Sequence, residues 1–455
     1  MRLSTRSLRL ICCLAAISAL TLACGLSRAE ETVAPPAPPS TPAAPTLAEN
    51  QPLPSDTPAA LAGTDDQALP LQLLQFGFGQ EETTLGYGFM VENPNPDLLI
   101  WDTSYQVEAF DAAGALIGST NGGVYTILPG QTLGVGGDLE LSEGSQAASI
   151  TVTLIDGTAQ PTEYTQPFEA YNAWFQEGEY SESVLSEIYN PYAVTYVSPL
   201  TFAVLFDQAG NIIGGGQSYI SFLPPQDYGA TVIMVTHAGQ VASVRVDAIV
   251  MDMEYNADPV LLPEGASDIQ LEGFGFGSDD YATGYGVVLY NPNDAVAAIN
   301  SSYMVIGYDA DGRVLEVSEG YLDLLQPGES KGVAGGFYFA DPQKVDHATV
   351  FVHPGEYIEM SPIPWFDVDQ ISYSEEGGLK SVFATVSNPY DQDQEFASVY
   401  AVLYDAEGTI IGGGTGYIDL LPASGSAEVE VYVYGGADPA DIRIFVDLID
   451  YTVLQ

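Results

Sequence analysis

The chain has 455 residues and a formal net charge of −51, with 10 basic and 61 acidic side chains. This excess of negative charge repels nucleic acid and anionic lipid, so neither is expected as a direct partner. The three cysteines, Cys12, Cys13 and Cys24, all lie near the N-terminus, which leaves no thiol further along the chain for disulfides, zinc or nucleophilic catalysis.

The N-terminal segment has the layout of a secretory signal. Three arginines precede an apolar run from 10 to 23, which is too short to span a bilayer. The run ends in Leu-Thr-Leu-Ala-Cys-Gly at 20–25, which resembles a bacterial lipobox. The resemblance implies that residues 1–24 are a lipoprotein signal peptide and that Cys24 is acylated, so we expect a lipid anchor in the cell membrane and a protein facing its extracytoplasmic side. The alternative is an ordinary secretory signal cut at a nearby small residue, with loss of Cys24.

Residues 25–69 are dominated by Pro, Ala, Thr and Ser. Such a composition cannot build a core and favours extended conformations, which predicts a disordered tether. After Cys24 the chain holds 7 basic and 61 acidic residues, so the mature charge is 7 minus 61, or −54. A surface of this kind suits cations or basic proteins, although solubility alone also explains it.

Beyond the tether the sequence repeats at one long, constant offset. Phe-Gly-Phe-Gly at 76–79 recurs at 274–277, and Ile-Ile-Gly-Gly-Gly at 212–216 recurs at 410–414. Within this period an Asn-Pro pair returns at 93, 190, 291 and 388, each time followed by an aromatic-Asp-x-x-Gly sequence. The pattern predicts four homologous units in an A-B-A-B order, from a duplicated two-unit ancestor. We place the units at 70–160, 161–258, 268–360 and 363–455.

Each unit has the pattern of short strands. Residues 396–404 are rich in β-branched and aromatic residues and are followed by Asp405 to Gly408, a turn that needs a positive φ at glycine. Residues 427–434 alternate between apolar and other side chains, as in a half-buried strand. The glycines of Phe-Gly-Phe-Gly are expected to leave room for facing rings, and Gly214 to Gly216 predict a bulged or closely approached strand. Together these signals predict an all-β chain of β-sandwich units.

The sequence from Tyr400 to Gly412, followed by Leu421-Pro422, resembles the FxLYD-type family of small immunoglobulin-like domains in prokaryotic exported proteins. The resemblance extends to all four units. It implies four tandem immunoglobulin-like β-sandwich domains and an extracytoplasmic setting. It implies no activity.

No motif predicts catalysis. Gly328-Glu-Ser-Lys-Gly matches the G-x-S-x-G nucleophile motif, but it lies at a Pro-Gly turn between strands rather than before a helix, so we interpret it as structural. His347 and His353 are six residues apart on a predicted strand, or roughly 20 Å, which is too far for one metal ion. The remaining histidine, His237, lies in another unit. We therefore predict that the protein is not an enzyme.

Two groups of residues are weak candidates for binding. Asp309 and Asp311 resemble the start of a calcium loop whose later ligands are missing, and Asp252 and Glu254 lie near the predicted join of the second and third units, where Ca²⁺ could relieve repulsion. Solvated carboxylates are the favoured interpretation, and no other cofactor is expected.

The second group surrounds an Asn-Pro turn. Tyr189, Tyr192 and Tyr196 could stack on a sugar or anchor a protein, although core packing is favoured. The sequence as a whole predicts a membrane-anchored, non-enzymatic binding, adhesion or spacer protein whose partner is a protein or glycan. The alternative is a structural scaffold subunit of a cell-envelope complex.

Overall fold

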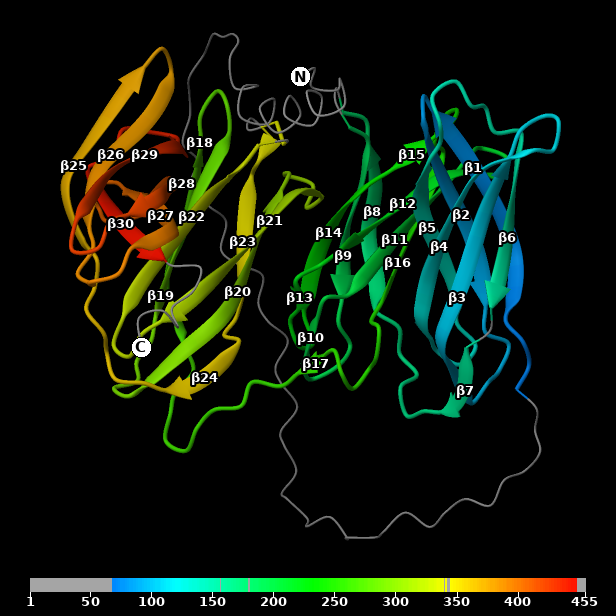
Figure 1. Ribbon diagram of the computed structural model, residues 1–455, viewed down its shortest axis with the longest axis horizontal. Coiled ribbons are helices and arrows are strands. Elements are labelled where there is room, and N and C mark those ends of the chain that lie inside the picture. The colour runs from blue at the N-terminus through cyan, green and yellow to red at the C-terminus, as the bar shows by residue number, and fades with distance from the viewer. Residues whose placement is uncertain (1–67, 156, 179–180, 339, 342–343, 448–455) are drawn as a thin grey trace. The chain divides into compact units, whose positions relative to one another are not determined.

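The computed structural model describes residues 68–447 except 156, 179–180, 339 and 342–343. The predicted signal peptide, Cys24, nearly all of the predicted tether and residues 448–455 thus lie outside the described residues. The described part is all-β, and its strands pair antiparallel in several sheets consistent with β-sandwich domains (Figure 1). In these ranges no helix is long and apolar enough to cross a membrane.

The first repeat has two facing sheets. One sheet has the order β1-β2-β5, and the other has the order β4-β3-β6, with β7 paired to the start of β3. Side chains such as Phe89, Val107 and Ile127 are fully buried in the core that joins the two sheets. The strands are β1 Gln72–Glu81, β2 Thr84–Glu92, β3 Leu98–Phe110, β4 Leu116–Ile127, β5 Thr132–Glu140, β6 Ser149–Ile155 and β7 Thr158–Pro161.

The second repeat also has two main sheets, β14-β9-β8 and β15-β12-β11-β16, with a small third sheet β13-β10-β17. Its strands are β8 Glu169–Gln176, β9 Ser183–Tyr189, β10 Thr195–Val197, β11 Leu200–Phe206, β12 Ile212–Tyr219, β13 Phe222–Leu223, β14 Tyr228–Met234, β15 Thr236–His237, β16 Ser243–Ile249 and β17 Ala257–Asp258. In the β11–β12 pairing Leu205 lies opposite Gly214 and Phe206 lies opposite Ile212, so the register skips Ile213, which confirms the predicted bulge beside the glycines.

The third repeat has the same strand order as the first, with sheets β18-β19-β22 and β21-β20-β23 and with β24 paired to β20. Its strands are β18 Gln270–Ser278, β19 Thr283–Tyr290, β20 Val296–Tyr308, β21 Val314–Leu325, β22 Ser330–Phe337, β23 His347–His353 and β24 Glu356–Glu359. Equivalent residues of the two repeats also pair in the same register, as in Tyr105 opposite Gly122 and Tyr303 opposite Gly320.

The fourth repeat forms one sheet of six strands, β25-β26-β29-β28-β27-β30. The sheet is continuous because β29 pairs with β26 along its length and with β28 at its end, where Gly413 lies opposite Tyr434. The strands are β25 Asp367–Glu376, β26 Leu379–Ser387, β27 Gln394–Tyr404, β28 Ile410–Leu421, β29 Ser426–Gly435 and β30 Asp441–Asp447.

Two recurring turns hold each repeat. The predicted Asp-x-x-Gly turns are confirmed, since their four glycines have φ of 80°, 80°, 77° and 82° at 114, 210, 312 and 408. The second recurring turn contains the Asn-Pro pair. The Asn291 amide donates to the carbonyls of Val296 and Leu325, and Asn93, Asn190 and Asn388 make equivalent bonds. All four asparagines are buried, so each links its own turn to the Leu-Pro-type turn that follows later in the same repeat.

The glycine motifs of neighbouring repeats face each other. A β-carbon on Gly77 would lie 2.1 Å from the carbonyl oxygen of Ile212, and one on Gly275 would lie 2.1 Å from that of Ile410. The sheet β1-β2-β5 therefore packs on β11 and β12 at backbone distance, and β18-β19-β22 packs on β27 and β28 in the same way. We call each of these contacts a glycine joint. The expectation that these glycines make room for facing rings is wrong, because they make room for the backbone of the next repeat.

A different contact joins the second and third repeats, which we call the central joint. Met304, Ile306 and Val314, from β20 and β21, are buried in the core cluster of the second repeat. The Trp174 Nε1 donates to the carbonyl of Val314 at 2.9 Å. Two polar contacts lie beside these apolar groups: Ser221 Oγ donates to Glu319 Oε1 at 2.7 Å, and His353 Nε2 lies 2.8 Å from Asp258 Oδ2.

Candidate functional site

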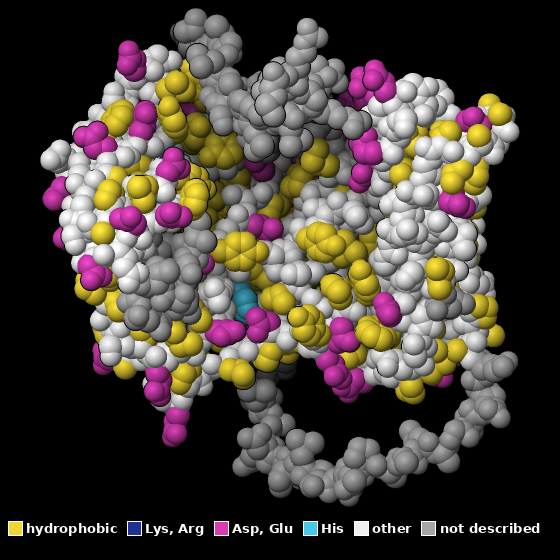
Figure 2. Space-filling model, in the orientation of Figure 1, with side chains coloured by type: hydrophobic (Ala, Val, Ile, Leu, Met, Phe, Trp, Pro, Cys, Tyr) yellow, Lys and Arg dark blue, Asp and Glu magenta, His cyan; other side chains and the backbone are white. Residues whose placement is uncertain are grey.

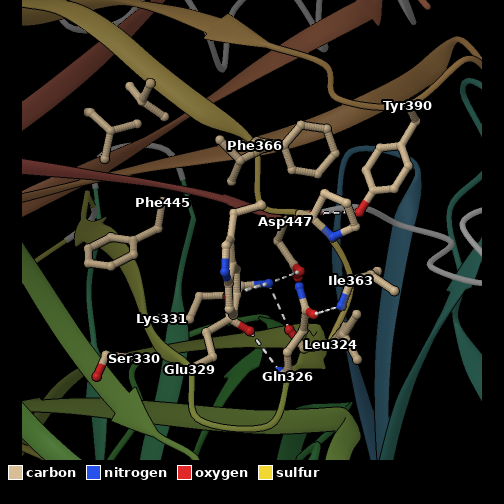
Figure 3. A pocket seen from close by; sticks show the side chains of 15 residues that line it. Leu324, Gln326, Glu329, Ser330, Lys331, Ile363, Phe366, Tyr390, Phe445 and Asp447 are labelled. Carbon is tan, nitrogen blue, oxygen red and sulfur yellow. Dashed lines mark hydrogen bonds and ion pairs between the residues drawn. The ribbon is translucent and has the colours of Figure 1, made fainter. Parts of the chain in front are cut away.

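A small pocket opens beside the glycine joint of the second half. Its volume is about 140 Å³, and it lies between β22, the end of β30 and the connection from β24 to β25 (Figure 3). Trp365, Phe366, Tyr390 and Phe445 supply aromatic walls, and the floor is charged. Aromatic walls over a charged floor are typical of sites that orient a ligand, so the pairing of the polar groups decides whether any of them is free to bind one.

The floor of the pocket is a buried ionic network. The Lys331 ammonium donates to Asp447 Oδ1 at 2.9 Å and to the carbonyl of Leu324 at 2.7 Å, and it lies 3.6 Å from Glu329 Oε1. The side chains of Lys331, Glu329 and Asp447 are 8%, 7% and 3% exposed. Asp447 also accepts the backbone N–H of Asp323 at 2.9 Å. The Lys331 ammonium is thus held by two hydrogen bonds and one further ion pair to protein oxygens.

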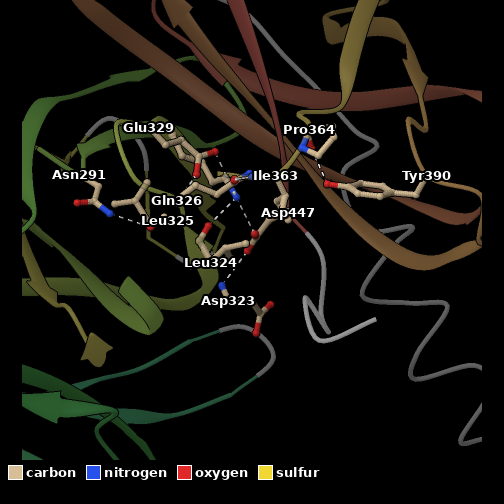
Figure 4. A network of polar contacts seen from close by, with 11 residues as sticks. Asn291, Asp323, Leu324, Leu325, Gln326, Glu329, Ile363, Pro364, Tyr390 and Asp447 are labelled. Atoms are coloured by element: carbon tan, nitrogen blue, oxygen red, sulfur yellow. Dashed lines mark hydrogen bonds and ion pairs between the residues drawn. The ribbon is translucent and has the colours of Figure 1, made fainter. Parts of the chain in front are cut away.

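The network extends to the connection between the repeats. Glu329 Oε2 accepts the backbone N–H of Gln326 at 2.7 Å, and the Gln326 Oε1 accepts that of Ile363 at 2.8 Å (Figure 4). The Tyr390 hydroxyl donates to the carbonyl of Pro364 at 2.5 Å. These bonds fix the segment that crosses the mouth of the pocket, so the charged groups act as a structural anchor between the third and fourth repeats.

Burial dominates the electrostatics of this network. Burial raises the pKa of Glu329 to about 7, against the opposing attraction of Lys331. Burial alone would lower the pKa of Lys331, but Asp447 and Glu329 outweigh it and raise that pKa above its ordinary value. Lys331 is therefore charged at neutral pH, whereas Glu329 titrates near it.

The first half has no such network at the equivalent place. Leu133, Gln131 and Ile249 stand where the second half has Lys331, Glu329 and Asp447. The equivalent pocket has a volume of about 10 Å³, and Val250 and Met253 form part of its wall. The residues that correspond to those two, Leu448 and Tyr451, lie outside the described residues.

A second feature of the second half is an exposed tyrosine surface. The rings of Tyr338 and Tyr434 meet edge to face at 5.5 Å. Tyr432 lies two residues from Tyr434 on the same face of β29, and both line a shallow hollow with Tyr281. Tyr338 and Tyr432 are each 52% exposed. We call Tyr281, Tyr338, Tyr432 and Tyr434 the tyrosine surface.

This surface is absent from the first half. At the four equivalent positions the sequence has Thr83, Glu140, Met234 and Thr236. The tyrosines therefore are not required by the shared fold. Sequence reasoning missed both this surface and the ionic network. The signal for both was the set of equivalent positions at which the sequences of the two halves differ.

The tyrosines predicted around the Asn-Pro turn are divided by the fold. Tyr196 is fully buried and packs on Tyr192 with ring centroids 5.4 Å apart, within a cluster that includes Phe168. The Tyr192 hydroxyl donates to the carbonyl of Gln166. Tyr189 lies apart from this cluster and packs on Tyr228. The geometry agrees with core and sheet packing, the interpretation favoured from the sequence.

The candidate calcium ligands are engaged in turns. Asp309 Oδ1 accepts the backbone N–H groups of Asp311 and Arg313, and Asp252 Oδ1 accepts those of Glu254 and Tyr255. Nowhere in the described ranges do three or more His, Cys, Asp or Glu side chains gather as a metal site.

Asp252 and Glu254 are in contact with the first repeat. Both line a wide hollow with Trp101 of that repeat, whereas the sequence placed them near the join with the third. The reason is that the chain after β16 turns back over the first repeat, where the carbonyl of Met251 accepts the Trp101 Nε1 at 3.2 Å.

The other candidates have structural surroundings. Ser330 begins β22 opposite Tyr290 on β19, and Gly328 before it has a φ of 71°, as expected of a turn between strands. His347 stacks on Tyr308 at 4.9 Å, and His237 Nε2 lies 2.9 Å from Glu182. None of these contacts pairs a histidine with Ser330 in the part of the chain that the structure describes.

Comparisons with known proteins add little. No family model matches the chain, and no curated protein is significantly similar to it. Among solved structures, pT26-6p is 7% identical with a TM-score of 0.12, over 80% of this chain and 65% of that one. The native conformation of E. coli alpha-2-macroglobulin is 8% identical with a TM-score of 0.13, over 86% of this chain and 28% of that one. The chain spans less than two thirds of either protein, and scores this low carry no argument. The likeness to FxLYD-type domains remains a prediction.

Proposed function

We propose that this protein is an extracytoplasmic lipoprotein, anchored in the cell membrane through an acylated Cys24, that acts as a non-enzymatic binding, adhesion or spacer protein through four immunoglobulin-like domains. The lipobox-like sequence and the antiparallel sheets support this proposal. Acidic side chains are spread over the face drawn in Figure 2, as suits a partner that is neither nucleic acid nor anionic lipid.

The tyrosine surface is the observation that carries the binding role. Exposed aromatic rings that lie close together offer a large contact area that loses little conformational freedom on binding. Tyr338 and Tyr432 are half exposed, whereas the equivalent positions of the first half hold Glu140 and Met234. The shared fold therefore does not explain these rings, and recognition of a protein or glycan outside the membrane does.

The test is a crosslinked pull-down of the tagged protein from its own cells. We expect the double variant Tyr338→Ala/Tyr432→Ala to lose its partner, and Cys24→Ala to leave the membrane fraction. The matched control is Tyr219→Ala/Tyr255→Ala, which removes two exposed tyrosines of the first half. Equal recovery of a partner by both double variants would refute a binding role for the tyrosine surface. Recovery of a membrane complex in equal amounts would instead favour a scaffold subunit of the cell envelope.

A further inference from the structure

The outward sheet faces of the second and fourth repeats are formed by equivalent strands but carry different side chains. In the second repeat this face carries Leu185, Val232 and Ala230, and the central joint covers it, so that Leu185 is only 1% exposed. In the fourth repeat the equivalent residues are Phe383, Glu430 and Glu428. Phe383 is 40% exposed, and both carboxylates are exposed. The same face is therefore apolar where a repeat follows it, and it carries two carboxylates beside the exposed rings of Phe383 and Tyr432 where no repeat covers it among the described residues.

The complementary faces of the third and first repeats differ in the same sense. Met304 and Ile306 of the third repeat are fully buried in the central joint. The first repeat has Gln106 and Glu108 at the equivalent positions, and both are partly exposed. Val317, which packs against the same core, is replaced by the exposed Ser119. The face that joins the two halves is apolar in the third repeat, and the equivalent face of the first repeat is thus polar.

We propose that the first and fourth repeats are end caps, and that their outward faces prevent copies of the chain from joining head to tail through a second central joint. Such a joint would bring Glu428 and Glu430 of one copy against Gln106 and Glu108 of another. Burial of carboxylates without cationic partners costs several kcal/mol each, by an order-of-magnitude estimate. Arrays of stacked repeats need polar terminal faces for this reason.

The proposal explains why the described repeats form one central joint and no second one through their outer faces. A duplicated two-repeat ancestor with identical halves would have carried a cohesive face at each end, and heterologous contacts of this kind do not close on themselves. The polar residues on the two end faces remove that cohesion, whereas the apolar residues of the central joint retain it. The end face of the fourth repeat includes Tyr432 and Tyr434 of the tyrosine surface, because they lie on the same side of β29 as Glu428 and Glu430. The inference does not rest on the proposed partner, since it concerns association of the chain with copies of itself.

The test restores the cohesive side chains at both ends of the full chain. One variant carries Gln106→Met, Glu108→Ile and Ser119→Val at the first repeat together with Phe383→Leu, Glu428→Ala and Glu430→Val at the fourth. Cys24→Ala is added throughout so that acyl chains cannot drive association. Sedimentation velocity over a range of concentrations measures the size distribution, and circular dichroism checks that each variant is folded.

We expect the unsubstituted ends to give monomers and the six-fold variant to give a series of oligomers that lengthens with concentration. Controls with only one end substituted should form nothing larger than a dimer, because an open series needs both faces. A folded six-fold variant that stays monomeric would overturn the proposal. Long oligomers from the unsubstituted ends, or from either single-end control, would overturn it as well.

Discussion

The two halves of the molecule share the same glycine joints, but they stabilise the region beside that joint differently. In the first half Leu133 and Ile249 are buried there among apolar groups, whereas the second half places Lys331 and Asp447 at the equivalent positions. The first half keeps its charged pair on a neighbouring site, where Arg245 contacts Asp247 at 2.6 Å. The comparison shows that one backbone accepts an apolar or an ionic solution, and that the ionic solution needs every charge to have a partner.

The strongest way to break this comparison is to remove one charge. Lys331→Ala leaves Asp447 and Glu329 buried without their cation, and we expect the second half to lose roughly 3–5 kcal/mol. Replacing all three charges with the residues of the first half, as Lys331→Leu, Glu329→Gln and Asp447→Ile, should be neutral or stabilising by up to about 4 kcal/mol. Urea unfolding at pH 7 measures both effects. A single variant that is as stable as the triple variant would contradict the prediction.

The glycine joints test what the halves share. Gly275→Ala places a β-carbon against the rigid carbonyl of Ile410, so we expect a loss of roughly 1–3 kcal/mol. Gly77→Ala should have an equal effect in the first half, since the carbonyl of Ile212 is equally close. Gly273→Ala is the control, because its β-carbon would meet side-chain atoms and no backbone, namely the terminal methyl of Ile410 at 3.2 Å and the β-carbon of Val288 at 3.9 Å. Thermal unfolding that ranks the control as the most damaging change would exclude this explanation.

The pH dependence sharpens the difference between the halves. Burial raises the pKa of Glu329 from 4.5 to about 7, so the folded state binds a proton more readily than the unfolded state. The stability from this group is complete below pH 4.5 and is lost as the pH rises through 7, by at most about 3 kcal/mol. Glu329→Gln, which introduces the residue of the first half, should remove this dependence of stability on pH. Urea unfolding of both proteins between pH 4.5 and 7.5 measures how the free energy of unfolding depends on pH. An identical dependence in the two proteins would refute the prediction.

The smallest effect concerns calcium. Asp309 and Asp252 already accept backbone N–H groups within their own turns, so Ca²⁺ has no preformed ligand set at either place. We expect millimolar Ca²⁺ to shift the melting temperature no more than Mg²⁺ at equal ionic strength, and EDTA to have no effect. A shift specific to Ca²⁺ that is lost in Asp252→Asn would restore the junction site predicted from the sequence.

Local patterns were enough to predict the strands, the turns and the repeat. The glycine of each Asp-x-x-Gly turn reports a backbone conformation that neighbouring residues alone impose, and it appears at Gly312 as predicted. The alternation in 427–434 likewise reports which side of a strand is buried. These signals depend on a few adjacent residues, so the all-β fold could be inferred without knowledge of what each strand contacts.

The sites depend on contacts between residues far apart in the chain. Lys331 and Asp447 are 116 residues apart, and neither has a local pattern that reveals a buried ion pair. The contact of the chain after β16 with Trp101 of the first repeat, 150 residues away, likewise has no local pattern.

The sequence by itself determined the element types, the A-B-A-B period and the scarcity of candidates for chemistry, because these follow from short-range sterics and composition. Only the tertiary structure decided that the glycine motifs face the next backbone, that four tyrosines gather on one surface and that the end faces differ from the central joint. The physical reason is that the burial of a side chain depends on both surfaces that meet at it. Leu185 is buried where β21 of the third repeat packs on its sheet, whereas Phe383 in the equivalent position remains exposed.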